Sequence, residues 1–325
     1  MSEIHDVDLN GGGHDFRVRV YPAENPNGAL LVWLHGGAFM FGSVDMPESD
    51  QVGRRLSAAG VSVVAVDYTL APLDALESLG PPDPALDIPT AAEMRAMAEA
   101  AGPRVRFPVA SLQTVAAFDW AVAHAAELGA DPARVALGGA SAGGNLSAGA
   151  ALRLRDRGEA QPSLVALVYP VLHSPLPPAS EELAAKLEGL PSHQTFPPES
   201  SAAINRNYLG DAEDEDGYAF PGGSDLTGLP ETLIVNADRD RLRASGEAFA
   251  AELASAGVHV RVVREHGSMH GFLNEVGHAA AERTMALIVD AAFTARSAGS
   301  SRSIRAERGD STDSFPRGSK AFGRS

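Results

Sequence analysis

The chain has 325 residues, of which 44% are hydrophobic and 21% are charged, and its formal net charge is −16. This composition is typical of a soluble globular protein with one large domain or two smaller ones. Such an acidic protein should repel nucleic-acid backbones and anionic membranes, so we expect neither as a partner. The absence of cysteine excludes disulfides and thiolate metal sites.

The beginning of the chain has no feature of a secretory signal. The first twenty residues are polar and lack a basic start followed by an apolar core. The longest apolar run, ALLVWL at 29–34, is too short to cross a bilayer. We therefore expect a cytoplasmic protein. The oligomeric state is open, and a homodimer is one alternative.

Short apolar strands alternate with longer helical stretches, which is the pattern of an α/β sheet. An in-and-out alternation at 16–21 predicts an edge strand, and the apolar run at 29–34 predicts a strand buried on both faces. The series of predicted strands continues at 61–68, 134–139, 164–170, 232–237 and 259–263. Helices are predicted between them, at about 109–128, 143–157, 243–256 and 277–295.

Three segments interrupt this alternation. Residues 73–105 are rich in proline and alanine, with a possible helix near 89–101, and residues 171–228 combine prolines with the acidic run DAEDED. The acidic run is not a calcium loop of the EF-hand type, because Ala212 and Gly223 occupy two ligand positions, so a solvated loop is favoured. Residues 297–325 have few apolar side chains and are predicted to be a disordered tail after one domain at 1–296.

The stretch GGASAGGNL, at 138–146, contains a candidate nucleophile. Residues 139–143 match the G-x-S-x-G nucleophile elbow, with Ser141 at its centre. The motif follows a predicted strand and opens a predicted helix, as an elbow requires. Its glycines suit a tight turn in which flanking side chains would clash, so we expect this stretch to be rigid. A phosphate-binding turn is less favoured, because no P-loop lysine and no G-x-G-x-x-G motif are present.

A serine hydroxyl needs a general base, and the chain offers ten histidines. In an α/β hydrolase the chain order is serine, then acid, then histidine after the last strand. His266 and His270 both follow the last predicted strand. We favour His270, which leads His-Gly-Phe at the start of the final helix, and interpret His259 and His278 as structural.

The base in turn needs an acid that orients it. Asp238 and Asp240 both follow the predicted strand at 232–237, and the residues alone do not decide between them. The oxyanion needs backbone N–H donors, which we expect from the glycine-rich stretch HGGAF at 35–39 and from Ala142, directly after the nucleophile.

With these pieces in order, the sequence resembles the hormone-sensitive-lipase-like family of α/β-hydrolase serine esterases. The resemblance covers about residues 15–295 and implies an α/β-hydrolase fold, with a mostly parallel sheet and a cap built from insertions. Laying the family's acid motif on residues 240–243 implies Asp240 as the acid. The family's oxyanion donors fall on Gly37, Ala38 and Ala142. The matching motifs are HGGAF (35–39), VDYTLAP (66–72), GGASAGGNL (138–146), YPVL (169–172) and SMHGF (268–272).

The sequence departs from the family at several places. Ala140 replaces the usual aspartate before the nucleophile, Ala38 replaces a glycine and Thr69 replaces an arginine, but no catalytic atom is lost. Members of the family usually carry a helical N-terminal arm, whereas this sequence begins almost at the first predicted strand, and 73–105 is an extra insertion. We hypothesise that this insertion replaces the arm as part of the cap, beside the main cap insertion at about 171–228. Its possible helix places Ile88, Ala91, Met94, Ala98 and Ala101 on one side. A surface excursion away from the site is the alternative.

These features predict a serine carboxylesterase that hydrolyses short- to medium-chain acyl esters through an acyl-enzyme, with no metal or organic cofactor. A non-catalytic small-molecule-binding protein of the same fold is one alternative, although the presence of His270 argues against it. A deacetylase or amidase with the same catalytic residues is another, and the sequence does not separate it from an esterase. His173 and His193 lie in the predicted cap, where ordinary loop histidines are the favoured interpretation.

Overall fold

The computed structural model describes residues 3–79, 89–190 and 195–295. The predicted tail at 297–325 lies outside the described residues, as do Ile88 and His193. Within these ranges, no helix has both the length and the hydropathy that a membrane span needs.

An eight-stranded sheet forms the centre of the molecule, in the order β1-β2-β4-β3-β5-β6-β7-β8. β1, β2 and β4 pair antiparallel at one edge, and all pairs from β4 to β8 are parallel. This mostly parallel sheet confirms the predicted fold class. The strands are β1 (His5–Gly11), β2 (His14–Tyr21), β3 (Gly28–Leu34), β4 (Ser62–Asp67), β5 (Ala130–Ala140), β6 (Val165–Val168), β7 (Thr232–Arg239) and β8 (Val260–Met269).

The structure adds elements that the pattern of apolar residues does not predict. β1 is a mostly exposed edge strand with the sequence HDVDLNG, so it lacks an apolar run. Because β1 pairs with the outer side of β2, the prediction that 16–21 is an edge strand is wrong. α1 (Pro47–Ala58) begins with proline at its first position and has Glu48 and Asp50 in its first turn. β8 continues past its predicted end at 263 to Met269.

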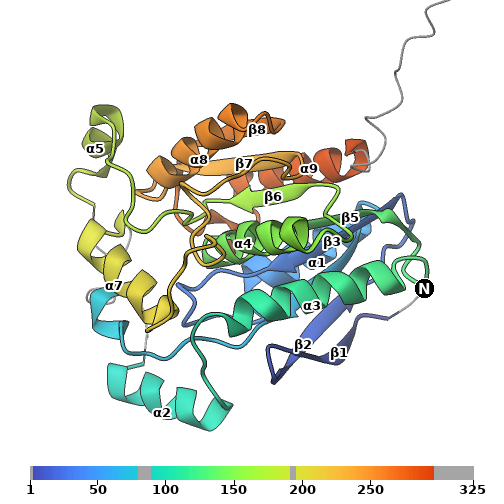
Figure 1. Cartoon of the computed structure of the whole chain (residues 1–325), viewed down its shortest axis with the longest axis horizontal. Helices are drawn as coiled ribbons and strands as arrows, with labels where there is room; N and C mark the ends of the chain where they lie inside the picture. Colours follow the sequence, from blue (N-terminus) through green and yellow to red (C-terminus); the bar gives the residue numbers. More distant parts are fainter. Residues whose placement is uncertain (1–2, 80–88, 191–194, 296–325) are drawn as a thin grey trace, which may run out of the picture.

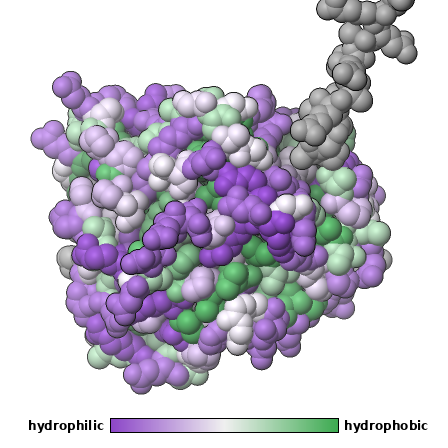
Figure 2. All heavy atoms as spheres, in the orientation of Figure 1, coloured by the Kyte–Doolittle hydropathy of each residue, from purple (hydrophilic) through white to green (hydrophobic). Residues whose placement is uncertain are grey.

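Alternate residues of β3 point to opposite faces of the sheet, and each face is covered by helices. Leu30, Val32 and Leu34 belong to a core cluster shared with α3 (Val109–His124) and α4 (Ala142–Arg157). Leu31 and Trp33 pack instead with α1 and α9 (Ala279–Thr294). α8 (Arg243–Ser255) packs on the α4 side (Figure 1). Figure 2 shows that the surface over this side is mostly hydrophilic.

The two insertions lie at the same end of the molecule, to the left in Figure 1. The longer one holds α5 (Glu181–Leu187) and α7 (Pro198–Leu209), and the other holds the short helix η1 (Leu76–Leu79) and α2 (Ala91–Ala101). α7 packs against η1, so the two insertions contact each other.

The predicted helix in the shorter insertion exists as α2. Thr90 and Glu93 form a capping box at its start, which satisfies two backbone donors. Met94 and Ala98 pack toward the core, as the predicted face requires. Ala101 was expected on the same face but is exposed, because it lies at the last position of the helix, where the chain turns away at Gly102.

Candidate active site

Ser141 lies at a sharp turn between β5 and α4. Its φ of 54° is unusual for a residue with a side chain, and its backbone N–H donates to Val168 O at 2.8 Å. The flanking glycines have no space for a Cβ atom. A methyl group on Gly139 would lie 2.5 Å from backbone atoms of Gly143, and one on Gly143 would lie 2.2 Å from Leu34 O. Tight packing of backbone against backbone therefore accounts for the glycines of this stretch.

The pairing of β7 with β8 places Asp240 beside His270. Arg239 is the partner of Met269 in the sheet, so the next residue of each strand leaves the sheet at the same edge. A shift of register between Ala237 and Arg239 places Asp238 in an irregularity of β7. The two side chains that leave together at the carboxyl end of the sheet are those of Asp240 and His270.

Three side chains form a continuous hydrogen-bonded chain. His270 Nε2 lies 3.0 Å from Ser141 Oγ, and His270 Nδ1 lies 2.7 Å from Asp240 Oδ2. Asp240 is fully buried, and its other oxygen accepts the backbone N–H of Leu242 at 2.9 Å. This arrangement can hold the imidazole with Nδ1 protonated and Nε2 free to accept the serine proton.

The surroundings of His270 favour its protonated form. Burial by itself lowers the pKa of His270, but the negative charge of Asp240 and its hydrogen bond outweigh that effect. The charge of Glu48 acts in the same direction, so the pKa of His270 is raised above its ordinary value of 6.5. An imidazole with this environment is suited to accept a proton near neutral pH.

The structure places the two competing candidates elsewhere. The carboxylate of Asp238 pairs with Lys186 on α5 at 2.5 Å and with Arg243 on α8 at 3.2 Å, and it also accepts the backbone N–H of Gly267. His266 is exposed at the surface of β8. His259 is exposed and pairs with Glu231.

The loop after β3 supplies backbone N–H groups near Ser141. Gly37, Ala38 and Phe39 all have positive φ values, of 115°, 54° and 62°. No described residue accepts a hydrogen bond from the amides of Gly37 and Ala38. The amide of Ala142 is in the first turn of α4, where N–H groups have no partner within the helix. Free amides of this kind can bind a developing oxyanion.

A small cavity of about 240 Å³ opens onto this constellation. Its wall includes Leu79 from η1 and Phe196 from the segment before α7, so both insertions contribute to it. The Phe196 ring lies 4.7 Å from the His270 ring, measured between centroids. Sequence reasoning did not single out either residue, because their insertions have weak periodicity. The lining residues are Gly37, Ala38, Phe41, Met46, Glu48, Leu79, Ser141, Phe196, His270, Gly271 and Asn274.

A second serine–histidine–carboxylate set lies apart from this cavity. His173 contacts Ser245 Oγ at 2.8 Å and Glu252 Oε1 at 3.0 Å. Ser245 is fully buried, and its hydroxyl already accepts the backbone N–H of Leu172. A substrate cannot reach this hydroxyl, so the set joins the segment after β6 to α8. His173 is thus a buried structural residue rather than an ordinary loop histidine.

Two other sequence features have structural roles. Ala140 is fully buried in the core cluster that also contains Tyr169 and Phe272, so the position before the nucleophile is apolar. In the acidic run, Asp214 accepts the backbone N–H groups of Ala219 and Phe220.

The described ranges contain no group of three histidine, aspartate or glutamate side chains that could hold a metal ion.

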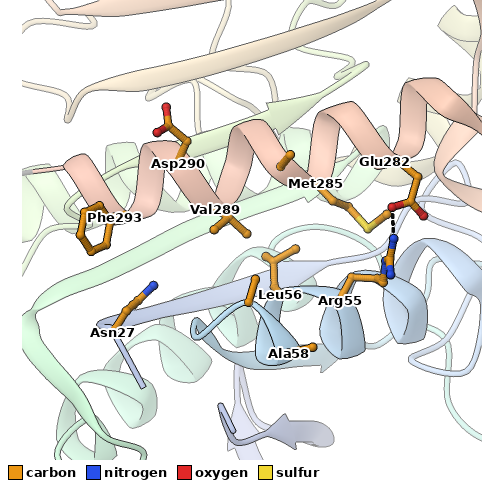
Figure 3. A pocket seen from close by; sticks show the side chains of 11 residues that line it. Asn27, Arg55, Leu56, Ala58, Glu282, Met285, Val289, Asp290 and Phe293 are labelled. Atoms are coloured by element: carbon orange, nitrogen blue, oxygen red, sulfur yellow. Dashed lines mark hydrogen bonds and ion pairs between the residues drawn. The ribbon is translucent and has the colours of Figure 1, made fainter. Parts of the chain in front are cut away.

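A separate groove lies between α1 and α9, with a volume of about 740 Å³ (Figure 3). The side chains of Arg55 and Glu282 meet across it in an ion pair, and Leu56, Met285 and Phe293 supply apolar surface. Neither Ser141 nor His270 lines this groove, so its size does not make it the site of the chemistry.

Comparison with known proteins identifies the family. A family model described as the alpha/beta hydrolase fold matches residues 31–78 and 100–274. The chain belongs to this family. The unmatched residues between the two segments, 79–99, fall inside the extra insertion at 73–105. The resemblance to α/β-hydrolase esterases is thereby confirmed.

Curated relatives of the chain are named as ester hydrolases. The carboxylesterase NlhH of Mycobacterium tuberculosis is 31% identical over 83% of this chain and 76% of its own length. An arylesterase of Saccharolobus solfataricus is 29% identical over 84% of this chain and 78% of its own length. The expectation that this family member is a carboxylic ester hydrolase is confirmed at the level of the enzyme class.

Solved structures agree with this assignment. The thermostable carboxylesterase EstE1, from a metagenomic library, has a TM-score of 0.72 and 31% identity, and the match covers 91% of this chain and 90% of that one. An esterase of Pyrobaculum calidifontis has a TM-score of 0.71 and 30% identity, over 90% of this chain and 84% of that one.

Proposed function

We propose that the protein is a serine carboxylesterase in which Ser141 is the nucleophile, His270 the general base and Asp240 the acid that orients it. The observation that carries this proposal is the hydrogen-bonded chain from Asp240 Oδ2 through His270 to Ser141 Oγ, with distances of 2.7 and 3.0 Å. The three residues follow the ends of three different strands, β5, β7 and β8, and Ser141 and His270 line the small cavity.

The proposed reaction proceeds in two steps. Ser141 Oγ attacks the ester carbonyl carbon while His270 Nε2 takes the hydroxyl proton, and the amides of Gly37, Ala38 and Ala142 bind the oxyanion. The C–O bond to the alcohol breaks as His270 returns the proton to the leaving oxygen. In the second step His270 activates a water molecule, which attacks the acyl-enzyme and releases the acid. His270 accepts and returns each proton in the two steps, so the proposed reaction needs no cofactor.

The small cavity supports short- to medium-chain acyl esters as substrates. Leu79, Phe196, Phe41 and Met46 give it an apolar wall, which suits an alkyl or aryl group. We propose that the insertions at 73–105 and 171–228 together form the cap, because each supplies a wall residue. A homodimer and a cytoplasmic location stay predictions.

The decisive experiment is the hydrolysis of p-nitrophenyl butyrate by Ser141→Ala. We expect kcat to fall by roughly 10³-fold or more, because the hydroxyl is the attacking group. Ser245→Ala is the matched control, since Ser245 also contacts a histidine but is fully buried; a folded Ser245→Ala should keep its activity within a few-fold. Wild-type turnover by Ser141→Ala would refute the proposal.

An amide-hydrolysing alternative has a specific observation in its favour. An arylacetamide deacetylase of Bos taurus is 24% identical over 83% of this chain. Comparing kcat/KM for phenyl acetate and acetanilide separates the two activities. We expect the ester to be preferred by several orders of magnitude, and comparable values would favour the deacetylase.

A further inference from the structure

Glu48 is a buried carboxylate in the wall of the active-site cavity that the proposed reaction does not use. It is 2% exposed and lies in the first turn of α1. Its Oε1 accepts the backbone N–H of Gly36 at 2.6 Å, and its Oε2 accepts the hydroxyl of Tyr169 at 2.8 Å. Both donors are neutral, so among the described residues its charge is met by hydrogen bonds instead of a cation.

Each of these two hydrogen bonds leads to a different part of the site. Gly36 immediately precedes the proposed oxyanion donors Gly37 and Ala38. The Tyr169 ring packs against the His270 ring, with 4.8 Å between centroids. A methyl group on Gly36 would lie 2.7 Å from Glu48 Oε1 and 3.0 Å from Ser141 Cβ, so the carboxylate and the nucleophile flank the same backbone position.

The backbone of Glu48 is also fixed. Its carbonyl accepts Trp33 Nε1–H at 2.8 Å, and its N–H donates to Asn274 Oδ1 at 3.2 Å. A carboxylate in the first turn of a helix is stabilised by the helix dipole, which offsets part of the cost of burying it. Two charge-assisted hydrogen bonds supply more of that stabilisation. Four hydrogen bonds, two to the carboxylate and two to the backbone, therefore fix Glu48 in place, and a fixed carboxylate can orient the groups that donate to it.

We propose that Glu48 is a positioning residue of the hydrolytic site, which holds the oxyanion loop at Gly36 and the Tyr169 ring against His270 with one carboxylate. This inference rests on the proposed function. The loop it holds is strained, since Gly37, Ala38 and Phe39 all have positive φ, and a strained loop keeps its conformation only when its surroundings impose it. Glu48 provides that constraint through the amide directly before the donors.

The main test is Glu48→Gln, which keeps the shape of the side chain and removes its charge and one acceptor. We expect kcat for p-nitrophenyl butyrate to fall about 10- to 100-fold, with KM within threefold, because an oxyanion donor acts in the transition state. The affinity for an alkyl boronic acid, which mimics the tetrahedral intermediate, should weaken by a similar factor. A residue that served stability alone would lower the melting temperature and leave both values unchanged.

The pH profile supplies a second readout. The titratable neighbours of His270 are Asp240 after β7, Glu48 on α1, Tyr169 after β6 and Ser141 before α4. Removing the negative charge of Glu48 should move the acidic limb of kcat/KM to lower pH. Tyr169→Phe keeps the charge of Glu48, so the acidic limb of kcat/KM should stay at the same pH in this variant, while kcat falls about 3- to 10-fold.

Asp50→Asn is the matched control, because Asp50 is also on α1 and also accepts a tyrosine hydroxyl, that of Tyr21. Its kcat, boronate affinity and acidic limb should match those of the wild type. Wild-type kcat and boronate affinity in Glu48→Gln would overturn the proposal. If Glu48→Gln does not fold, unchanged values in Tyr169→Phe would overturn it instead. Neither result would contradict the proposed function, which is tested separately by Ser141→Ala.

Discussion

Asp240 and Asp238 are two residues apart, yet their carboxylates face different partners. Asp240 Oδ2 lies 2.7 Å from His270 Nδ1, whereas Asp238 pairs with Lys186 on α5 and Arg243 on α8. The irregularity of β7 at Asp238 separates the two directions. One strand end thus serves the proposed reaction and the attachment of α5 at the same time.

This separation predicts opposite phenotypes for two equivalent substitutions. Asp240→Asn should lower kcat by roughly 10³-fold or more, because the amide favours the wrong imidazole tautomer, with little change in melting temperature. Asp238→Asn should leave kcat within a few-fold but lower stability by roughly 1–2 kcal/mol, because the buried Arg243 loses one charged partner while Glu182 and Glu247 remain. Steady-state kinetics and thermal unfolding of both variants check this. A larger kinetic defect in Asp238→Asn would reverse the assignment.

The pKa of His270 predicts an acidic limb in the activity profile. The imidazole must be neutral to accept the Ser141 proton, so kcat/KM should fall as the pH drops through this pKa. Although burial opposes it, Asp240 raises the pKa above 6.5, and the midpoint of the limb should therefore lie above 6.5. Measuring kcat/KM between pH 5 and 9 tests the sign, and a midpoint clearly below 6.5 would contradict it.

The nucleophile turn should be intolerant of a single added methyl group. In Gly143→Ala the new Cβ would lie 2.2 Å from Leu34 O, so we expect a loss of roughly 3 kcal/mol or more, or failure to fold. Gly158→Ala is the control for the added methyl group, because nothing lies within 4 Å of its added Cβ; its φ of 73° is positive, unlike that of Gly143, so only backbone strain is expected there. Its cost should be about 1 kcal/mol. Equal unfolding free energies for the two variants would show that packing at Gly143 is not limiting.

Leu79 should limit the length of the acyl chain. Leu79→Ala removes apolar wall from a small cavity, so the ratio of kcat/KM for p-nitrophenyl octanoate to that for the butyrate should rise roughly tenfold. Met97→Ala is the control from the same insertion, since Met97 on α2 is 62% exposed. An unchanged ratio in Leu79→Ala would favour the view that the insertion at 73–105 is a surface excursion.

Much of the fold and of the candidate site was predictable from local patterns. Buried parallel strands are continuous apolar runs, so most of the sheet is visible in the sequence. The glycines around Ser141 and the HGGAF stretch are visible for a related reason, since close backbone contacts exclude side chains wherever they occur. The elements that escaped prediction, β1 and α1, are partly exposed and carry no such pattern.

The tertiary structure alone decided which polar groups meet. Asp238 and Asp240 have equivalent sequence positions after a predicted strand, so the residues themselves left the choice open until the family resemblance favoured Asp240. In the structure, the register of β7 with β8 directs the two carboxylates to different partners. Glu48 is one of 42 acidic residues, and nothing local distinguishes it, because its partners Gly36 and Tyr169 are 12 and 121 residues away. Leu79 likewise lines the cavity from η1, which packs against the distant helix α7. Local sequence patterns reflect burial and backbone geometry within one element, whereas contacts between residues far apart in the sequence depend on how the whole chain packs.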